Sequence, residues 1–267
     1  MRMPGFPGVV MCWNLLFAAS AAGVLAPAEA ADSAAPPNAA AAAVPAEIEK
    51  ALQLPKGADQ TKALTSAATE WAKKDPVAAL SWAMHLPRDF PAGVHGAVVN
   101  TCAVNSGKVT ADWMVQNYKA PGFGELHGVL YIWSWKGDAP SAAAWCAQAP
   151  KSARDIAFFS VGDGWFLKDQ PAASEWATKL ETDDDRHSAI RGISLKWGRA
   201  NIPTATVWIK KLKPDEIQIA ARTLLSDWTQ NKFKKDGARD EAAIKEWIEQ
   251  LPLNAAEKEE LLKEPIK

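Results

Sequence analysis

Cysteine is nearly absent from the sequence, with three residues in a chain of 267. Cys12 lies in an apolar N-terminal stretch that is expected to be removed, which leaves Cys102 and Cys146. Two cysteines permit one disulfide bond but not the framework of bridges that stabilises small secreted domains. Each lies in a helical pattern, where a small buried thiol is the commoner outcome, so the sequence leaves a Cys102–Cys146 bridge open.

An excess of charge of either sign is also missing. The chain has 30 Lys and Arg against 31 Asp and Glu, and a formal net charge of -1. Proteins that bind nucleic acid need a basic surface to neutralise phosphates. The near balance of charge therefore argues against nucleic acid as a partner.

The common catalytic motifs are absent. The sequence has no nucleophile elbow, phosphate-binding loop, zinc-protease helix or haem-attachment motif. His95 and His127 are 32 residues apart and each precedes a glycine, which raises a bridging metal between adjacent repeats as an alternative. A half-buried histidine beside a glycine is the preferred interpretation. We therefore predict no catalytic residues, no cofactor and no metal.

No apolar run is long enough to cross a membrane. Val9 to Leu25 is apolar but short, and it follows a charge at Arg2 and precedes the small residues of Ala28 to Ala30. This pattern predicts a signal peptide over residues 1–30. We expect an exported protein, periplasmic or extracellular, with no transmembrane span in the mature chain. The Ala- and Pro-rich residues 31–45 predict a disordered linker, and residues 46–267 an α-helical repeat domain.

Tryptophan, by contrast, is abundant, with 13 residues that mostly form pairs 11 or 12 positions apart. The first members of the pairs recur every 31 or 32 residues, close to the period of two-helix repeats of the tetratricopeptide type. One helical hairpin cannot cover its own apolar face, so we expect these residues to fill the seams between stacked units. The predicted structural positions are Trp71 and Trp82, Cys102 and Trp113, Trp133 and Trp145, Trp165 and Trp176, Trp197 and Trp208, and Trp228 and Trp247.

A helix-start pattern lies between the members of four of these pairs. An Asp or Asn cap satisfies free amide groups at the start of a helix, and proline in the first turn has no amide to leave unpaired. The sequence therefore predicts an all-α fold: an α-solenoid of about six two-helix repeats with terminal capping helices at Ala46 to Leu54 and Leu253 to Lys263. Phe233 to Asp240 predicts a longer loop in the last repeat. The four caps are Asp75, Asp138, Asp169 and Asn201.

The segment from Trp71 to Trp82 carries the pattern W-x-x-x-D-P-x-A-A-x-x-W. It resembles a motif of uncharacterised exported bacterial helical-repeat proteins, and the resemblance extends from about Gln60 to Trp247. It implies a tetratricopeptide-like solenoid, with no established activity and no catalytic residues to carry over. The second repeat departs from the pattern, because Ser106 and Gly107 stand where Asp and Pro are expected.

Three residues of the third repeat are candidates for binding. His127, Tyr131 and Trp135 are at i, i+4 and i+8, so they line one face of a helix. Trp133 already fills the tryptophan position of this repeat, which makes Tyr131 and Trp135 additional to the pattern. In tetratricopeptide-like stacks the first helix of each hairpin lines the concave face, where extended ligands lie. Packing in the core is the alternative for such a row of aromatic residues.

These features favour a non-catalytic scaffold of the cell envelope that binds a protein or peptide. A carbohydrate or cell-wall binding accessory protein is the first alternative, because exposed aromatic residues also suit glycans. The second alternative is a hydrolase with an unrecognised site, in which Glu125 and Asp163 form an acid and base pair. Nothing in the sequence fixes the separation of these two carboxylates.

Overall fold

The computed structural model describes residues 43–87, 89–117, 123–227, 234–235 and 238–263. The signal peptide predicted over residues 1–30, all but the end of the linker predicted over residues 31–45, and Trp228 lie outside these ranges.

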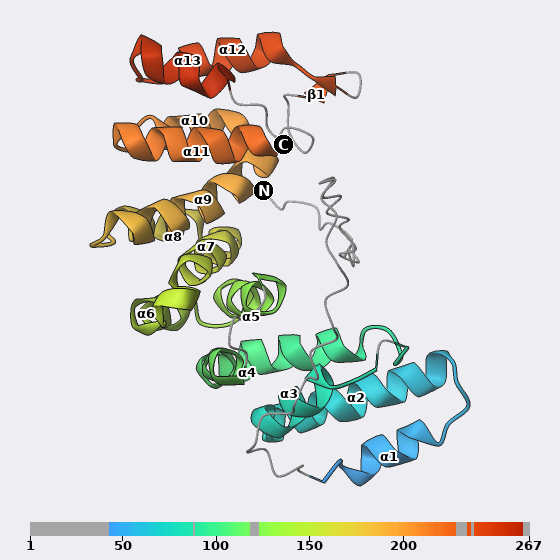
Figure 1. The fold of residues 1–267 in the computed structure, drawn as a ribbon. Coiled ribbons are helices and arrows are strands. Elements are labelled where there is room, and N and C mark those ends of the chain that lie inside the picture. Colours follow the sequence, from blue (N-terminus) through green and yellow to red (C-terminus); the bar gives the residue numbers. More distant parts are fainter. Residues whose placement is uncertain (1–42, 88, 118–122, 228–233, 236–237, 264–267) are drawn as a thin grey trace, which may run out of the picture. The chain divides into compact units, whose positions relative to one another are not determined.

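The regular structure of the described residues is helical apart from one short antiparallel ribbon, in agreement with the all-α prediction (Figure 1). Long helices alternate with shorter ones, except that two long helices follow one another near the middle and two short ones at the end. The long helices are α2 (Ala58–Lys74), α4 (Val94–Asn117), α5 (Phe123–Lys136), α7 (Lys151–Lys168), α9 (Asp183–Ala200) and α11 (Pro214–Ser226). The short helices are α1 (Ala46–Leu52), α3 (Pro76–Met84), α6 (Ala139–Gln148), α8 (Gln170–Thr178), α10 (Ile202–Ile209), α12 (Glu241–Glu249) and α13 (Ala255–Lys263).

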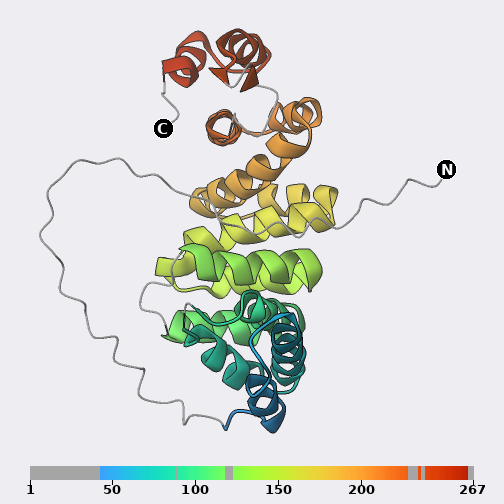
Figure 2. The same cartoon turned by 90° about the vertical axis from the view of Figure 1, so that its right-hand side faces the viewer.

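The helices contact one another in chain order. Each long helix packs against the next, from α2 through α4, α5, α7 and α9 to α11. The short helices α3, α6, α8 and α10 each contact the long helix before them and the long helix after them. In the turned view of Figure 2 the described helices again follow one another in the order of the sequence colours. Neighbours along the chain therefore bury one another's apolar faces.

The short helices begin at the predicted caps. The side chains of Asp75, Asp138, Asp169 and Asn201 each accept a hydrogen bond from the amide three residues later, and a proline occupies the first turn of α3, α6, α8 and α10. Each such cap is worth about 1 kcal/mol. The helix α9 begins at Asp183 after a Thr182 cap, so its first turn is acidic, as suits the positive end of the helix dipole.

Helix α4 is two helices joined at a kink. Ser106 has φ -144° and ψ 43°, an extended φ close to that of the Asp75 cap at -138°. At Ser106 the chain therefore passes from one helix to the next as it does at Asp75, but without a proline. A Cβ at the following Gly107 would lie 2.2 Å from the indole ring of Trp133. Glycine is required there because the Trp133 ring packs directly on the backbone.

Tryptophans fill contacts both within and between helix pairs. Ring centroids lie 5.8 Å apart in Trp71 and Trp82, 5.5 Å in Trp165 and Trp176, and 5.2 Å in Trp197 and Trp208. Trp247 Nε1 of α12 donates to Thr206 Oγ1 of α10 at 2.8 Å. The residues at the tryptophan positions are buried at Trp71, Cys102, Trp113, Trp133, Trp145, Trp197, Trp208 and Trp247, and partly buried at Trp82, Trp165 and Trp176.

One detail differs from the expectations. Lys234–Lys235 (β1) and Ala238–Arg239 (β2) pair as an antiparallel ribbon within the segment Phe233 to Asp240, for which a longer loop was predicted. The sequence between the strands is Asp-Gly, a strong signal for a tight hairpin that the loop prediction overlooked. The preferred interpretation of the two cysteines as small buried thiols is confirmed: Cys102 and Cys146 are both free and buried, and burial raises the pKa of each thiol, to about 12 for Cys102.

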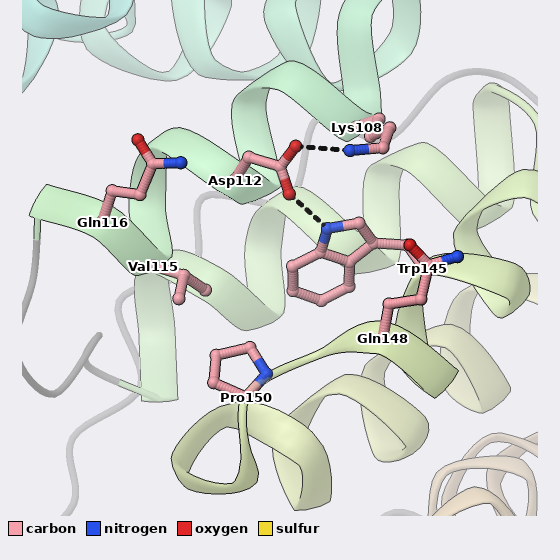
Figure 3. A pocket seen from close by; sticks show the side chains of 7 residues that line it. All are labelled: Lys108, Asp112, Val115, Gln116, Trp145, Gln148 and Pro150. Carbon is pink, nitrogen blue, oxygen red and sulfur yellow. Dashed lines mark hydrogen bonds and ion pairs between the residues drawn. The ribbon is translucent and has the colours of Figure 1, made fainter.

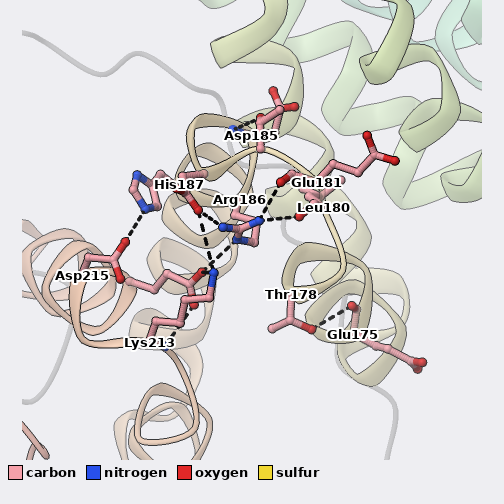
Figure 4. A network of polar contacts seen from close by, with 12 residues as sticks. Glu175, Thr178, Leu180, Glu181, Asp185, Arg186, His187, Lys213 and Asp215 are labelled. Carbon is pink, nitrogen blue, oxygen red and sulfur yellow. Dashed lines mark hydrogen bonds and ion pairs between the residues drawn. The ribbon is translucent and has the colours of Figure 1, made fainter.

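A charged network joins α9 to its neighbours (Figure 4). Arg186 is 7% exposed, and its Nε donates to Glu216 Oε1 of α11 at 3.0 Å while its Nη1 donates to the Leu180 carbonyl at 2.6 Å. On the other side, Arg154 of α7 donates two hydrogen bonds to the Asp185 carboxylate, each of 2.7 Å. Both carboxylates are buried and paired, which fixes the register of α7, α9 and α11.

Candidate functional site

The side chains of His127, Tyr131 and Trp135 form a continuous row on α5, which we call the aromatic stripe. The His127 and Tyr131 rings stack with centroids 5.7 Å apart, and the Tyr131 and Trp135 centroids are 5.6 Å apart. All three residues are partly exposed, whereas Leu130 and Trp133 of the same helix are buried. Tyr131 and Trp135 also contact the core, so the stripe is partly a packing surface and partly open to solvent.

A buried carboxylate lies behind the stripe. Asp163 of α7 is 1% exposed. Its Oδ2 is 3.8 Å from His127 Nε2, and its Oδ1 is 3.4 Å from Nζ of Lys196 on α9. Lys196 Nζ also lies 5.0 Å from the centre of the Tyr131 ring, and His127 Nδ1 is 3.0 Å from Ser160 Oγ. We call these five residues the Asp163 cluster.

Glycines bring the three helices of the cluster together. A Cβ at Gly164 would lie 2.1 Å from Ser134 Oγ and 2.3 Å from the Tyr131 carbonyl oxygen. A Cβ at Gly192 would lie 2.1 Å from the Phe159 carbonyl oxygen. Real side chains do not approach so closely, so only glycine permits the contacts of α5 with α7 and of α7 with α9. This close packing is what excludes solvent from Asp163.

Burial dominates the electrostatics of the Asp163 cluster. It raises the pKa of Asp163 to about 6, although the positive charge of Lys196 acts in the opposite direction. It lowers the pKa of His127 to about 4, with a smaller contribution from Lys196. It also raises the pKa of Tyr131 to about 12, and the charge of Asp163 adds to this. At neutral pH the cluster therefore holds an ionised Asp163 beside a charged Lys196, with His127 and Tyr131 neutral.

The described residues use only part of the hydrogen-bonding capacity of the Asp163 carboxylate. Its Oδ1 has an ion-pair partner in Lys196, whose Nζ is 3.4 Å away, but no hydrogen-bond partner among the described residues. Ser160 Oγ, by comparison, donates to the Ile156 carbonyl at 2.6 Å. The contacts of this ionised carboxylate therefore offset only part of the free-energy cost of its removal from water. The charged pair of Asp163 and Lys196 therefore lies against His127 and Tyr131 of the aromatic stripe.

The two carboxylates of the hydrolase alternative lie in different surroundings. Glu125 is exposed at the start of α5, beside His95, whereas Asp163 is buried among α5, α7 and α9. The two histidines of the metal alternative also have different neighbours, since His95 Nε2 is 3.3 Å from Met84 Sδ. Across the part of the chain that the structure describes, no three His, Cys, Asp or Glu residues gather as metal ligands would.

A cavity of about 310 Å³ lies between α3, α4 and α5, and we call it the glycine cavity. Gly96, Gly124 and Gly128 line it, together with the side chains of Met84 and Met114. In the sequence its visible signal is a pair of glycines four residues apart within one helix, Gly124 and Gly128. Ser160 and Lys196 have no distinguishing sequence pattern, so they were not predicted.

A smaller cavity of about 140 Å³ lies between α4 and α6 (Figure 3). Asp112 occupies one side of it. One carboxylate oxygen accepts from Trp145 Nε1 at 2.7 Å and the other pairs with Lys108 Nζ at 2.6 Å. These contacts already use the Asp112 carboxylate, and they join α6 to the second half of α4. We assign the pair a structural role.

Comparison with protein families, with curated proteins and with solved structures found no match to this chain. None of the helices in the described ranges combines the length and the apolar character needed to cross a membrane.

Proposed function

We propose that this protein is a non-catalytic scaffold of the cell envelope that binds an extended protein or peptide segment along α5. The aromatic stripe is the observation that carries the proposal. Its three rings are in mutual contact and partly exposed, on a helix that glycine-mediated packing holds against α7. Rigid, partly exposed tyrosine and tryptophan side chains are frequent anchors of protein interfaces, because they bury a large area at little cost in conformational entropy.

The proposal includes the finer features of the predicted architecture. We propose an α-solenoid of about six two-helix repeats with a period of 31–32 residues, similar to tetratricopeptide proteins. Contacts of the long helices in chain order and the recurring Asp or Asn caps support it. The predicted signal peptide over residues 1–30 supports export, and the Ala- and Pro-rich residues 31–45 support a tether between the envelope and the helical domain.

One exposed cation beside the stripe suits a peptide that carries a carboxylate. Lys136 Nζ lies 4.5 Å from the centre of the Trp135 ring. Lys196, which lies over Tyr131, and Arg199, one turn further along α9, are already paired with Asp163 and Asp227. A glycan is the second candidate ligand, because adjacent Tyr131 and Trp135 rings offer flat apolar faces to sugar rings.

A peptide-display selection on the immobilised full chain tests the proposal. We expect selected peptides to bind the wild-type chain and to lose at least tenfold in affinity for the Tyr131→Ala, Trp135→Ala double variant. Val207→Ala, at a 60% exposed apolar position on α10, is the matched control and should bind as the wild type does. Thermal unfolding of each variant separates loss of binding from loss of fold.

Two results would contradict the peptide proposal. If the double variant binds the selected peptides as tightly as the wild type, the aromatic stripe is not the binding surface. If no peptide is selected and a glycan array instead shows saturable, stripe-dependent binding, the carbohydrate function replaces the peptide function.

A further inference from the structure

Three helical glycines line the glycine cavity without a conformational reason to be glycine. Gly96 lies in α4, and Gly124 and Gly128 lie in α5. None of the three has a positive φ. Glycine inside a helix costs about 1 kcal/mol relative to alanine. This cost applies to Gly128 in the interior of α5, whereas Gly96 and Gly124 lie in the first turns of α4 and α5.

Close packing does not explain these glycines either. At each position, apart from the adjoining residues and backbone of its own helix, no atom of the described residues lies within 4 Å of where a Cβ would stand. Gly107, Gly164 and Gly192 are different, because a Cβ at any of them would meet a neighbour at less than 2.5 Å. Gly96, Gly124 and Gly128 instead leave open space, and that space is the cavity of about 310 Å³.

The glycine cavity and the aromatic stripe lie on the same face of α5. Gly124, Gly128, Tyr131 and Trp135 are at i, i+4, i+7 and i+11, which fall together on an α-helix. With a rise of 1.5 Å per residue, this face is about 17 Å long. An extended peptide of about five residues spans that length. One half of the face is empty of side chains, and the other half carries aromatic rings.

The lining of the cavity indicates what it accepts. Met84, Val99 and Met114 supply an apolar floor, and the flexible thioether side chains of methionine adapt to ligands of different shape. At the rim, burial lowers the pKa of His95, so this histidine is neutral at pH 7. Glu125 is then the charged side chain that the described part of the lining presents. An apolar group next to a positive charge complements this lining.

We propose that the glycine cavity binds a large apolar side chain of a peptide whose adjacent residue is basic, while the following residues lie on the aromatic stripe. The placement of the peptide on the stripe rests on the function proposed above. The missing side chains of Gly96, Gly124 and Gly128 make the room, Met84 and Met114 contact the apolar group, and Glu125 faces the basic residue.

The native methionines give a direct readout of the cavity. The chain has five, of which Met1, Met3 and Met11 precede the described residues, and the other two, Met84 and Met114, both line the cavity. In the full chain with 13C-labelled methionine methyl groups, Met84→Leu and Met114→Leu assign the two signals. We expect N-acetyl-Leu-Lys-amide to shift both signals saturably. N-acetyl-Ala-Lys-amide and N-acetyl-Leu-Glu-amide should each bind at least tenfold more weakly.

Filling the cavity should abolish this response. Gly128→Leu places a side chain in the open space and exchanges a poor helix former for a good one, so the helix is retained and binding falls at least tenfold. Ser66→Leu, at an exposed position of α2, adds the same side chain elsewhere and should leave binding unchanged. An unresponsive pair of methionine signals in the wild type, or an equal response in Gly128→Leu, would overturn the proposal.

The dipeptide separates this proposal from the function on which it rests. It is too short to reach from the cavity to Trp135, so its binding should persist in the Trp135→Ala variant. If the dipeptide binds, but the binding of longer peptides does not depend on the stripe, the peptide scaffold function fails and the cavity assignment stands. If stripe-dependent peptides bind while Met84 and Met114 do not respond, the cavity assignment alone is overturned.

Discussion

Lys196 Nζ of α9 lies 3.4 Å from Oδ1 of Asp163 on α7, and only 11% of the lysine side chain is exposed. The pair crosses the contact between the two helices directly behind the aromatic stripe. Because both charges have lost most of their hydration, the position of the lysine depends on the carboxylate, and the protonation of the carboxylate depends on the lysine. The ring of Tyr131 rests against the same ammonium group. Substitution of either residue of this pair should therefore affect the aromatic stripe, which is the proposed binding surface.

Removal of the lysine should destabilise the fold. Lys196→Met leaves a buried Asp163 without its cation, which costs about 3–5 kcal/mol in the free energy of unfolding. Denaturant unfolding at pH 7 measures the loss. The control is Lys179→Met, because Lys179 pairs with Glu175 on an exposed surface, where such pairs contribute at most about 1 kcal/mol. Equal effects of the two substitutions would show that the Asp163 pair is not a buried one.

The pH dependence of stability should differ in sign between two variants of the Asp163 cluster. The folded-state pKa of Asp163, about 6, exceeds its ordinary value of 3.8, so the folded chain binds more protons and Asp163 lowers stability as pH rises through this range. The pKa of His127 falls from 6.5 to about 4, so this residue raises stability as pH rises. Each shift corresponds to about 3 kcal/mol. The two contributions nearly cancel in the wild type.

Single substitutions should expose each contribution. Between pH 4 and 6, His127→Gln should lose stability relative to the wild type as the pH rises, whereas Asp163→Asn should gain it. Melting temperatures measured across this range test the prediction. Parallel pH profiles for the two variants would contradict the opposite shifts of the two pKa values.

The buried arginine between α9 and α11 should be a major source of stability. Arg186→Met leaves Glu216, which is 3% exposed, without its buried cation and with only Lys213 as a partner, and we expect a loss of about 3–5 kcal/mol. The double variant Arg186→Met, Glu216→Leu should recover most of it, since no unpaired charge is then buried. Chemical denaturation of the single and double variants decides the matter, and a double variant no more stable than the single would argue against this explanation.

Two glycine substitutions of equal size should have opposite effects. Gly192→Ala places a Cβ 2.1 Å from the Phe159 carbonyl oxygen and should destabilise the fold by about 1–3 kcal/mol through separation of α7 from α9. Gly128→Ala meets open space and should stabilise the helix by about 1 kcal/mol. Melting temperatures of the two variants should move in opposite directions. A gain in stability for Gly192→Ala would refute the close approach.

The local parts of the fold could be predicted because their causes are local. The Asp75 and Asn201 caps, each followed closely by proline, determine where α3 and α10 begin, and neither needs a distant partner. The tryptophan spacing likewise located the helix pairs. The ribbon at Lys234–Lys235 also has a local cause, the adjacent Asp-Gly sequence, which is typical of a tight hairpin rather than of a longer loop.

The candidate site could be predicted only in part. The aromatic stripe follows from spacing on one helix. Asp163, Ser160 and Lys196 reach it from two further helices, and that depends on the register between helices, which no single segment specifies. The glycines show the same limit. Gly128 and Gly192 are identical in the sequence, yet one leaves space and the other permits a contact, and only the neighbouring helix determines which.

The two buried cysteines can serve as reporters of local opening of the fold. Cys102 and Cys146 are wholly buried free thiols, and burial raises the pKa of both, so neither forms a thiolate readily while its helices stay packed. Each thiol then reacts with an alkylating reagent only when the helices around it separate transiently. Its alkylation rate therefore reports how often, or to what extent, they separate. Cys102 reports on α4 and Cys146 on α6, the helices on either side of α5 in the sequence. A ligand held along α5 should therefore slow alkylation at both positions at once.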